Sequence, residues 1–119
     1  MPPKLLFLTP EKLFLGRGVL DVLEALVKFG RVERFVIDEA HCVCEWGSDF
    51  RPHYAQLSEL KKLFPSIKIL AMTATAPPDM RKELISGLLL QNCKVFYASY
   101  NRPNLRYSVK KVEKKDLCD

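Results

Sequence analysis

Residues 34–41 read RFVIDEAH, and this stretch decides the fold. Its first half, residues 34–37, is rich in aromatic and β-branched residues, which is typical of a strand buried in a sheet. Its second half places two carboxylates, Asp38 and Glu39, directly behind that strand. Because burying a charge is costly, the strand is predicted to end at Ile37, with both acids at the exposed edge of a sheet.

Similar apolar runs occur at residues 5–8, 67–72 and 93–97. Between these runs, apolar residues repeat with helical spacing over residues 19–27, 54–64 and 80–88. Gly30 and the prolines at positions 52, 65, 77 and 78 mark the ends of these helices. The order β-α-β-α-β-α-β predicts an α/β fold, with a mostly parallel sheet covered by helices on both faces in three layers.

The ligands of parallel sheets collect beyond the carboxyl ends of the strands, so we expect the chemistry there. Mg²⁺ prefers oxygen ligands and keeps several waters, which makes Asp38 a candidate ligand, directly or through water. Glu39 is a candidate for activating an attacking water, and His41 for reporting the nucleotide state to neighbouring loops. The alternative is a polar turn that only caps the following helix.

Hydroxyl residues follow two other predicted strands. Thr9 comes after residues 5–8 and is placed to cap a helix, whose first N–H groups also suit a phosphate. Thr73 and Thr75 come after residues 67–72, where they suit hydrogen bonds to a neighbouring carboxylate or to a helix end. From these residues alone, capping remains an alternative after both strands.

The loop before residue 54 carries Trp46, Phe50 and Arg51 among Gly and Pro residues. Two rings outside any amphipathic stripe, close to a guanidinium, suit stacking on a single strand of nucleic acid and contact with its phosphates. The alternative is that both rings fold back onto the core.

The composition limits the possible classes of protein. A chain of 119 residues with 48% hydrophobic and 28% charged residues is predicted to be soluble and globular, and no larger than one small domain. It lacks the run of roughly 18 apolar residues that a membrane helix needs, and its start is a poor signal peptide, so we expect an intracellular protein without a membrane partner. The net charge of +5 permits nucleic-acid binding. Much of the excess lies in Lys110, Lys111, Lys114 and Lys115, where a solvated C-terminus is the alternative.

The four cysteines are Cys42, Cys44, Cys93 and Cys118. Together with His41 the first two suggest a metal site, but the second pair that structural zinc sites use is missing. We therefore expect reduced thiols, as in a cytosolic or nuclear protein.

Taken together, these segments resemble the RecQ family of DNA helicases, within superfamily 2. The DEAH box at residues 38–41 runs directly into residues 42–52, which resemble the aromatic-rich loop of that family. Residues 70–76 resemble motif III, residues 5–13 resemble the motif Ib strand with its Thr-Pro-Glu turn, and residues 100–105 resemble the Asn-Arg-Pro-Asn-Leu segment that closes the first motor domain. The motifs come in the family's order and span nearly the whole chain.

The resemblance implies that residues 1–105 are the C-terminal part of a RecA-like motor domain, followed at 106–119 by a basic linker or tail toward a second motor domain. It implies ATP and Mg²⁺ as cofactors of the complete enzyme, and single-stranded DNA and duplex junctions as partners, with further helicase regions or partner proteins possible. Asp38, Glu39 and His41 are then catalytic, both acids bind the nucleotide, and Asp38 is the Mg²⁺ ligand. The residues implied in DNA contact or in its coupling to ATP are Thr9, Trp46, Asp49, Phe50, Arg51, Thr73 and Thr75.

The activity that the resemblance implies is ATP-dependent 3′-to-5′ DNA unwinding in repair and recombination, in the nucleus of a eukaryote or the cytoplasm of a bacterium. Cys44, Glu45 and Ser48 stand where the family usually has Ser, Gln and His, and Ser48 cannot replace a titratable ring in coupling. The phosphate-binding pattern G-x-x-x-x-G-K-[ST] does not occur in the chain, so the isolated chain is predicted neither to hydrolyse ATP nor to unwind DNA. The alternatives are a catalytically dead module that binds single-stranded DNA or a partner, and a non-functional truncation.

Overall fold

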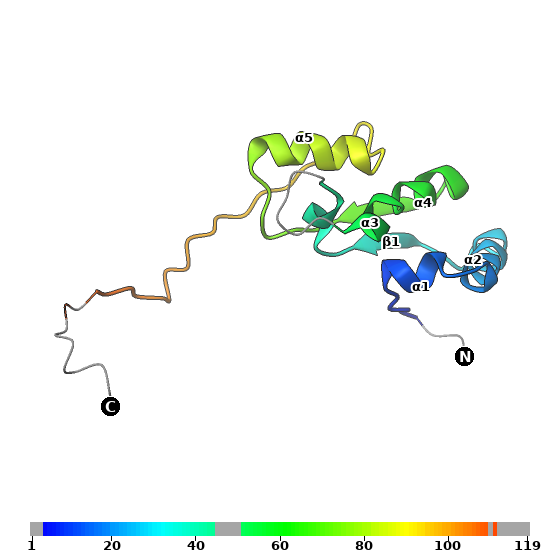
Figure 1. Cartoon of the computed structure of the whole chain (residues 1–119), viewed down its shortest axis with the longest axis horizontal. Helices are drawn as coiled ribbons and strands as arrows, with labels where there is room; N and C mark the ends of the chain where they lie inside the picture. Colours follow the sequence, from blue (N-terminus) through cyan, green and yellow to red (C-terminus); the bar gives the residue numbers. More distant parts are fainter. Residues whose placement is uncertain (1–3, 45–50, 110, 112–119) are drawn as a thin grey trace, which may run out of the picture.

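Two parallel strands, β1 (Arg34–Ile37) and β2 (Lys68–Ala71), form the sheet of the computed structural model, which describes residues 4–44, 51–109 and 111 (Figure 1). The short 3-10 helix η1 (Ala40–Val43) follows β1 directly. The helices around the strands are α1 (Pro10–Phe14), α2 (Gly18–Lys28), α3 (Pro52–Ala55), α4 (Ser58–Leu63) and α5 (Pro78–Gly87).

The two strands pair with Arg34 opposite Lys68 and Ile37 opposite Ala71. Parallel neighbours need a crossover connection, which here runs through η1, α3 and α4. Successive side chains of a strand point to opposite faces, so Ile37 is buried in the core while Val36 is 49% exposed. Both strands lie within one residue of the ranges that the sequence predicted.

Helices occur in all three regions where the apolar periodicity predicted them. The helix at 19–27 is α2, and Gly30 follows it with φ of 65°, a conformation that glycine adopts without strain. The stripe at 54–64 is divided into α3 and α4. Between them the N–H groups of Leu57 and Leu60 donate to the carbonyls of Tyr54 and Leu57, a tighter three-residue pattern that interrupts the α-helix.

The two outer strand predictions, at residues 5–8 and 93–97, are wrong. Both segments are irregular, and exposed side chains such as Phe7 at 86% and Phe96 at 85% mark them. A strand is held by backbone hydrogen bonds to a neighbouring strand, and among the described residues neither segment makes such bonds. Apolar composition therefore identified the segments but not their pairing partners.

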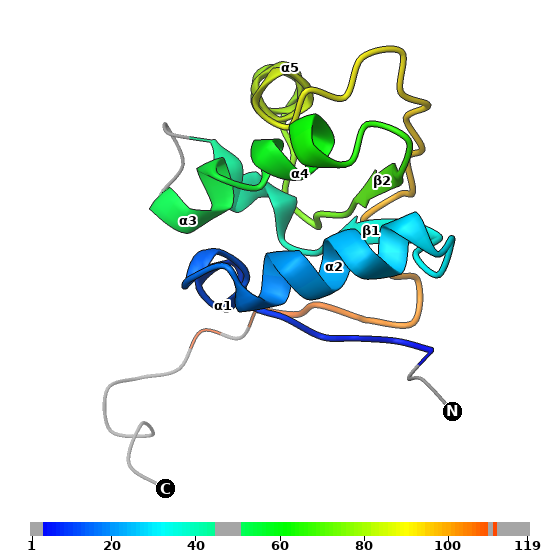
Figure 2. The ribbon, with the colours of Figure 1, turned by 90° about the vertical axis from the view of Figure 1, so that its right-hand side faces the viewer.

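The core lies where the helices meet the sheet. Leu13 of α1, Leu23 of α2, Ile37 of β1, Leu60 of α4 and Leu84 of α5 are all buried in one cluster. Figures 1 and 2 show α5 on one side of the strands and the α1–α2 pair on the other. This arrangement confirms the predicted α/β class with flanking helices, and it leaves the carboxyl ends of β1 and β2 side by side.

Candidate functional site

The end of β1 delivers Asp38 and Glu39 to the edge of the sheet. Ile37 is buried, whereas the two acids that follow it are exposed. Glu39 has φ of 49° and ψ of 41°, in the left-handed region that residues other than glycine rarely adopt. Its N–H donates to the Asp38 carboxylate at 2.9 Å. Such a strained residue persists only where its surroundings hold it, and functional sites are where this is common.

The neighbouring strand holds this turn in place. The N–H of Met72 donates to the Ile37 carbonyl at 2.8 Å, and the N–H of Ala40 donates to the Met72 carbonyl at 2.9 Å. Ala40 is completely buried, so no solvent competes for these bonds. The backbones at the ends of β1 and β2 are therefore fixed relative to each other.

His41 connects the two strand ends a second time, through its side chain. Its Nδ1 lies 2.9 Å from Thr73 Oγ1 and 3.3 Å from Glu39 Oε2. One ring nitrogen of His41 therefore lies within reach of both the Glu39 carboxylate and the Thr73 hydroxyl. The His41 side chain is 16% exposed and that of Glu39 is 58% exposed. The mostly buried His41 ring thus contacts the Glu39 carboxylate and restricts its movement, while that carboxylate stays exposed to solvent.

The Thr73 hydroxyl is oriented toward His41 by a local turn. Its Oγ1 accepts from the Thr75 N–H at 3.1 Å, and the hydroxyl donates to the Thr75 carbonyl, also at 3.1 Å. Threonine commonly makes such bonds with residues two positions further on. Helix α5 begins later, at Pro78, without a side-chain cap. Capping is therefore not the role of Thr73, and its hydroxyl belongs to the network of the DEAH turn.

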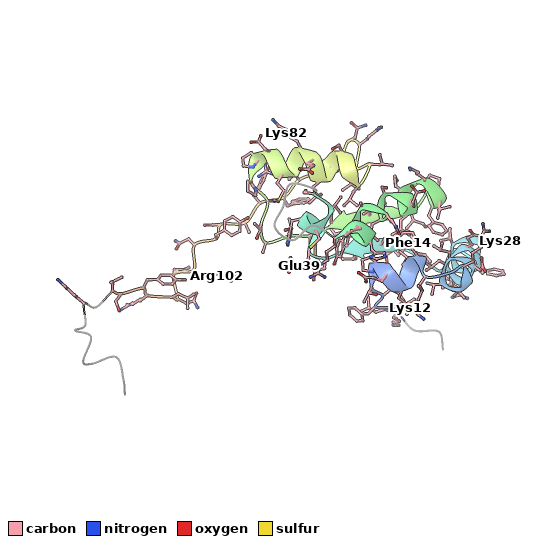
Figure 3. All side chains as sticks on the ribbon, viewed as in Figure 1. Lys12, Phe14, Lys28, Glu39, Lys82 and Arg102 are labelled. Atoms are coloured by element: carbon pink, nitrogen blue, oxygen red, sulfur yellow. The ribbon has the colours of Figure 1, made fainter. Side chains whose placement is uncertain are left out.

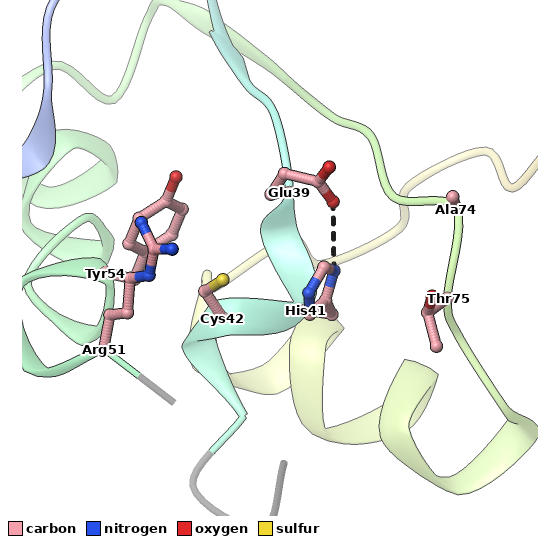
Figure 4. Close-up of a pocket in the computed structure, with 7 residues that line it drawn as sticks. All are labelled: Glu39, His41, Cys42, Arg51, Tyr54, Ala74 and Thr75. Atoms are coloured by element: carbon pink, nitrogen blue, oxygen red, sulfur yellow. Dashed lines mark ion pairs between the residues drawn. The ribbon is translucent and has the colours of Figure 1, made fainter. Parts of the chain in front are cut away.

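A cavity of about 410 Å³ opens beside this network (Figure 4). Its walls come from the DEAH turn, from the turn after β2 and from the start of α3. In Figure 4, Glu39 and His41 lie between Arg51 with Tyr54 on one side and Ala74 with Thr75 on the other. The lining residues are Glu39, His41, Cys42, Arg51, Tyr54, Ala74 and Thr75.

Arg51 brings a positive charge into the cavity that Glu39 lines. Its backbone N–H donates to the Cys42 carbonyl at 3.1 Å, and its guanidinium carbon lies 6.0 Å from the centre of the Tyr54 ring. Burial raises the pKa of Tyr54, and the nearby Cys42 raises it further. The phenol therefore stays neutral at physiological pH and keeps its proton for hydrogen bonding.

A larger groove of about 1060 Å³ runs along β1, bordered by residues 4–10. Asp38 and Thr9 line this groove, and Tyr54 borders both the groove and the cavity. Asp38 and Thr9 therefore line the same groove, whereas Glu39 lines the cavity with His41, Arg51 and Thr75, although the two acids are adjacent in the chain.

Thr9 caps α1, as the sequence predicted. Its hydroxyl accepts from the Lys12 N–H at 3.2 Å. The pKa of Glu11, in the first turn, is lowered first by its hydrogen bond to the backbone and then by Thr9, with a smaller effect of His53. Glu11 Oε1 lies 3.8 Å from His53 Nδ1, so the Thr-Pro-Glu turn contacts α3 directly.

Helix α5 is anchored to η1 by two close contacts. The Cys44 thiol donates to the Met80 carbonyl at 3.5 Å, and burial raises the pKa of that thiol. A Cβ atom at Gly87 would lie 2.9 Å from Val43 Cγ1, closer than side chains normally approach. The position of the DEAH turn therefore depends on how α5 is seated.

Trp46, Asp49 and Phe50 lie outside the described residues, so of the predicted DNA-contacting loop the structure places Arg51. Sequence reasoning missed Tyr54 and Cys42 as cavity residues. The apolar periodicity places Tyr54 on a helical stripe, and its position two residues after the Arg-Pro pair is the available signal. The sequence suggests Cys42 only as a metal ligand.

Among residues 4–44, 51–109 and 111, no group of three or more His, Cys, Asp or Glu side chains is arranged to hold a metal ion by itself. Asp38 nevertheless suits Mg²⁺ bound together with a nucleotide, because it offers exposed carboxylate oxygen at a strand end. Within the same residues, no helix is long and apolar enough to cross a membrane.

Residues 2–84 match the DEAD/DEAH box helicase family, and the chain belongs to that family. The relatives confirm the resemblance to RecQ-type helicases. The chain is 50% identical over 115 residues to ATP-dependent DNA helicase Q-like 4B of Arabidopsis thaliana, which is 97% of this chain and 10% of that protein. It is 46% identical over 114 residues to ATP-dependent DNA helicase hus2/rqh1 of Schizosaccharomyces pombe, covering 96% of this chain and 8% of the relative. It is also 43% identical over 106 residues to RecQ-like DNA helicase BLM of Xenopus laevis, covering 89% and 8%. The chain thus spans a tenth or less of these relatives.

Proposed function

We propose that the chain supplies the DEAH part of an ATPase site, and the segment that couples this site to DNA, in a RecQ-type 3′-to-5′ DNA helicase. The observation that carries this proposal is the Glu39–His41–Thr73 network, in which one ring nitrogen of His41 contacts both the DEAH turn and the turn after β2. The family match and the relatives' names support the nucleotide and the DNA as substrates.

The two acids have separate tasks in this proposal. Asp38 holds Mg²⁺, directly or through water, beside the nucleotide phosphates. When bound, the ion neutralises charge on phosphate oxygens. Glu39 orients the attacking water and takes its proton, which requires a carboxylate that solvent can reach and that does not rotate away. Its 58% exposure and its 3.3 Å contact with His41 meet both requirements.

Coupling to DNA runs through groups that lie on either side of the Glu39 carboxylate. A displacement of residues 73–75 changes the partner of His41 and with it the support of Glu39. Arg51 links DNA contact to the DEAH turn from the other side of Glu39, because its backbone N–H donates a hydrogen bond to the Cys42 carbonyl. Thr9 and Arg51 contact the DNA backbone, with Trp46, Asp49 and Phe50 completing the contact. The relatives are eukaryotic, which supports a nuclear location. Single-stranded DNA and duplex junctions are the proposed substrates.

A chimera tests the proposed roles. This chain replaces the matching 115-residue segment of the Arabidopsis helicase Q-like 4B, and ATP turnover is measured with Mg²⁺ and single-stranded DNA. We expect Glu39→Gln to lower turnover by roughly 10²- to 10⁴-fold, since a general base is removed without a change of shape. The control is Glu59→Gln on α4, which breaks a surface ion pair with Lys62 and leaves the cavity untouched. Equal turnover by the parent chimera and its Glu39→Gln variant would refute the assignment.

A further inference from the structure

One segment carries positive charge and aromatic rings but takes no part in the DEAH site. We call residues 94–109 the basic–aromatic segment. The sequence has no Asp or Glu from residue 84 to residue 112, so no acid offsets the cations of this segment. Its cations are Lys94, Arg102 and Arg106, and its rings are Phe96, Tyr97, Tyr100 and Tyr107.

The aromatic rings of this segment are exposed to solvent. Tyr97 is 68% exposed, Tyr100 73% and Tyr107 88%. Figures 1 and 3 show the segment leaving α5 and running away from the helices, with Arg102 on the distant part. These rings contribute little to the core, and their phenol groups tolerate water better than purely apolar rings do.

The first of the tyrosines is fixed to the folded body. The Arg81 guanidinium carbon of α5 lies 4.3 Å from the centre of the Tyr97 ring, and Arg81 Nη1 donates to Tyr97 Oη. One cation therefore covers part of the ring and fixes its orientation, while 68% of the residue stays exposed. The exposed face of the Tyr97 ring can therefore stack on another planar group, with a guanidinium beside it.

Further tyrosine rings and arginine side chains follow Tyr97 along the segment. Tyr97 and Tyr100 are three residues apart, at most about 10 Å on an extended chain. A turn follows, in which the Leu105 N–H donates to the Arg102 carbonyl at 2.9 Å, with Pro103 at the position that such turns favour. Arg102 thus lies at a bend between Tyr100 and Tyr107, and both it and Arg106 fall between these two rings in the chain.

We infer that the basic–aromatic segment, together with Arg81, is a second contact surface for single-stranded nucleic acid. Tyr97, Tyr100 and Tyr107 stack on bases, and the interleaved cations contact phosphates. Single strands offer both partners at once, since unpaired bases present flat faces beside a row of negative charges. An acidic polypeptide would pair its carboxylates with the cations but would offer the tyrosine rings no partner for stacking. The inference deepens the proposed function by adding a second contact for the same nucleic acid, and it needs no ATP.

Fluorescence anisotropy of the 119-residue chain with labelled dT20 tests this inference. Replacing both Tyr100 and Tyr107 by Ala should weaken binding by at least about tenfold, whereas replacing both by Phe should preserve it because the stacking face remains. Replacing Arg102 and Arg106 by Gln should reduce the salt slope by about 1.4, since each lost phosphate contact removes about 0.7 for a single strand. These positions lie outside the core, and circular dichroism of each variant is the control that its fold is retained.

The outcomes separate this inference from the proposed function. If Trp46→Ala abolishes binding and the double Ala variant binds like the parent, the second surface is refuted while the loop role stands. If the double Ala variant alone loses binding, the second surface stands and the loop role fails. rU20 should bind like dT20, because stacking and phosphate contact do not read the sugar. Competition by poly-glutamate as strong as that by dT20, with no effect of the Ala substitutions, would also overturn the inference.

Discussion

The contact between α5 and η1 gives the sharpest test of how the DEAH turn is positioned. An Ala at Gly87 would place its Cβ 2.9 Å from Val43 Cγ1, which forces one of the two elements to shift. Overpacking of this kind costs about 1–3 kcal/mol. Replacing a helical Gly by Ala returns about 0.5–1 kcal/mol from backbone entropy. The free energy of unfolding should therefore fall by about 0–2.5 kcal/mol.

A double-mutant cycle with Val43→Ala isolates the contact between the two positions. Without Cγ1 at position 43, Gly87→Ala meets no obstacle and should stabilise the chain by about 0.5–1 kcal/mol. The two effects of the same substitution therefore differ by about 1–3 kcal/mol, which is the coupling energy between the two positions. Urea unfolding followed by circular dichroism measures all four proteins. Additive effects, with Gly87→Ala behaving equally in both backgrounds, would refute the close contact.

Three further predictions concern the groups that hold the site. Thr73→Val removes the hydrogen bonds of that hydroxyl and should cost about 1–3 kcal/mol in urea unfolding, whereas Thr75→Val, whose hydroxyl makes no hydrogen bond among the described residues, should cost little. Thr9→Ala should cost about 0.5–2 kcal/mol by uncapping α1, and Thr9→Ser should restore the stability; equal losses in both would contradict the cap. Burial raises the pKa of the Cys44 thiol above its ordinary value of 9.0, so its contribution to stability is complete below pH 9 and is lost as the pH rises through the raised pKa. The free energy of unfolding should thus decrease in alkaline solution, and less steeply in Cys44→Ser.

The surroundings of Asp38 and Glu39 show which features of the candidate site a sequence can predict. The strand at 34–37 and the two acids behind it were predictable, because apolar composition and the cost of burying charge act locally. The structure shows that Asp38 lines the groove and Glu39 the cavity, a division that no pattern in the sequence predicts. Tyr54 was missed because its place on an apolar helical stripe does not show that its side chain borders a cavity.

The outer segments show the opposite failure. Residues 5–8 and 93–97 have strand composition, yet neither forms a strand, because hydrogen bonds to a neighbour and not composition make a sheet. The helices were more predictable, since their hydrogen bonds close within the segment itself. The exception, the break between α3 and α4, follows from local three-residue turns.

The sequence by itself determined the α/β class, the order of helices and inner strands, the cap at Thr9 and the residues of the DEAH turn, because each depends on neighbours a few positions away. Only the tertiary structure decided that His41 shares its ring nitrogen between Glu39 and Thr73, and that Cys44 and Gly87 seat α5 against η1. These contacts join residues that are distant in the chain, and their distances follow from the packing of the whole core.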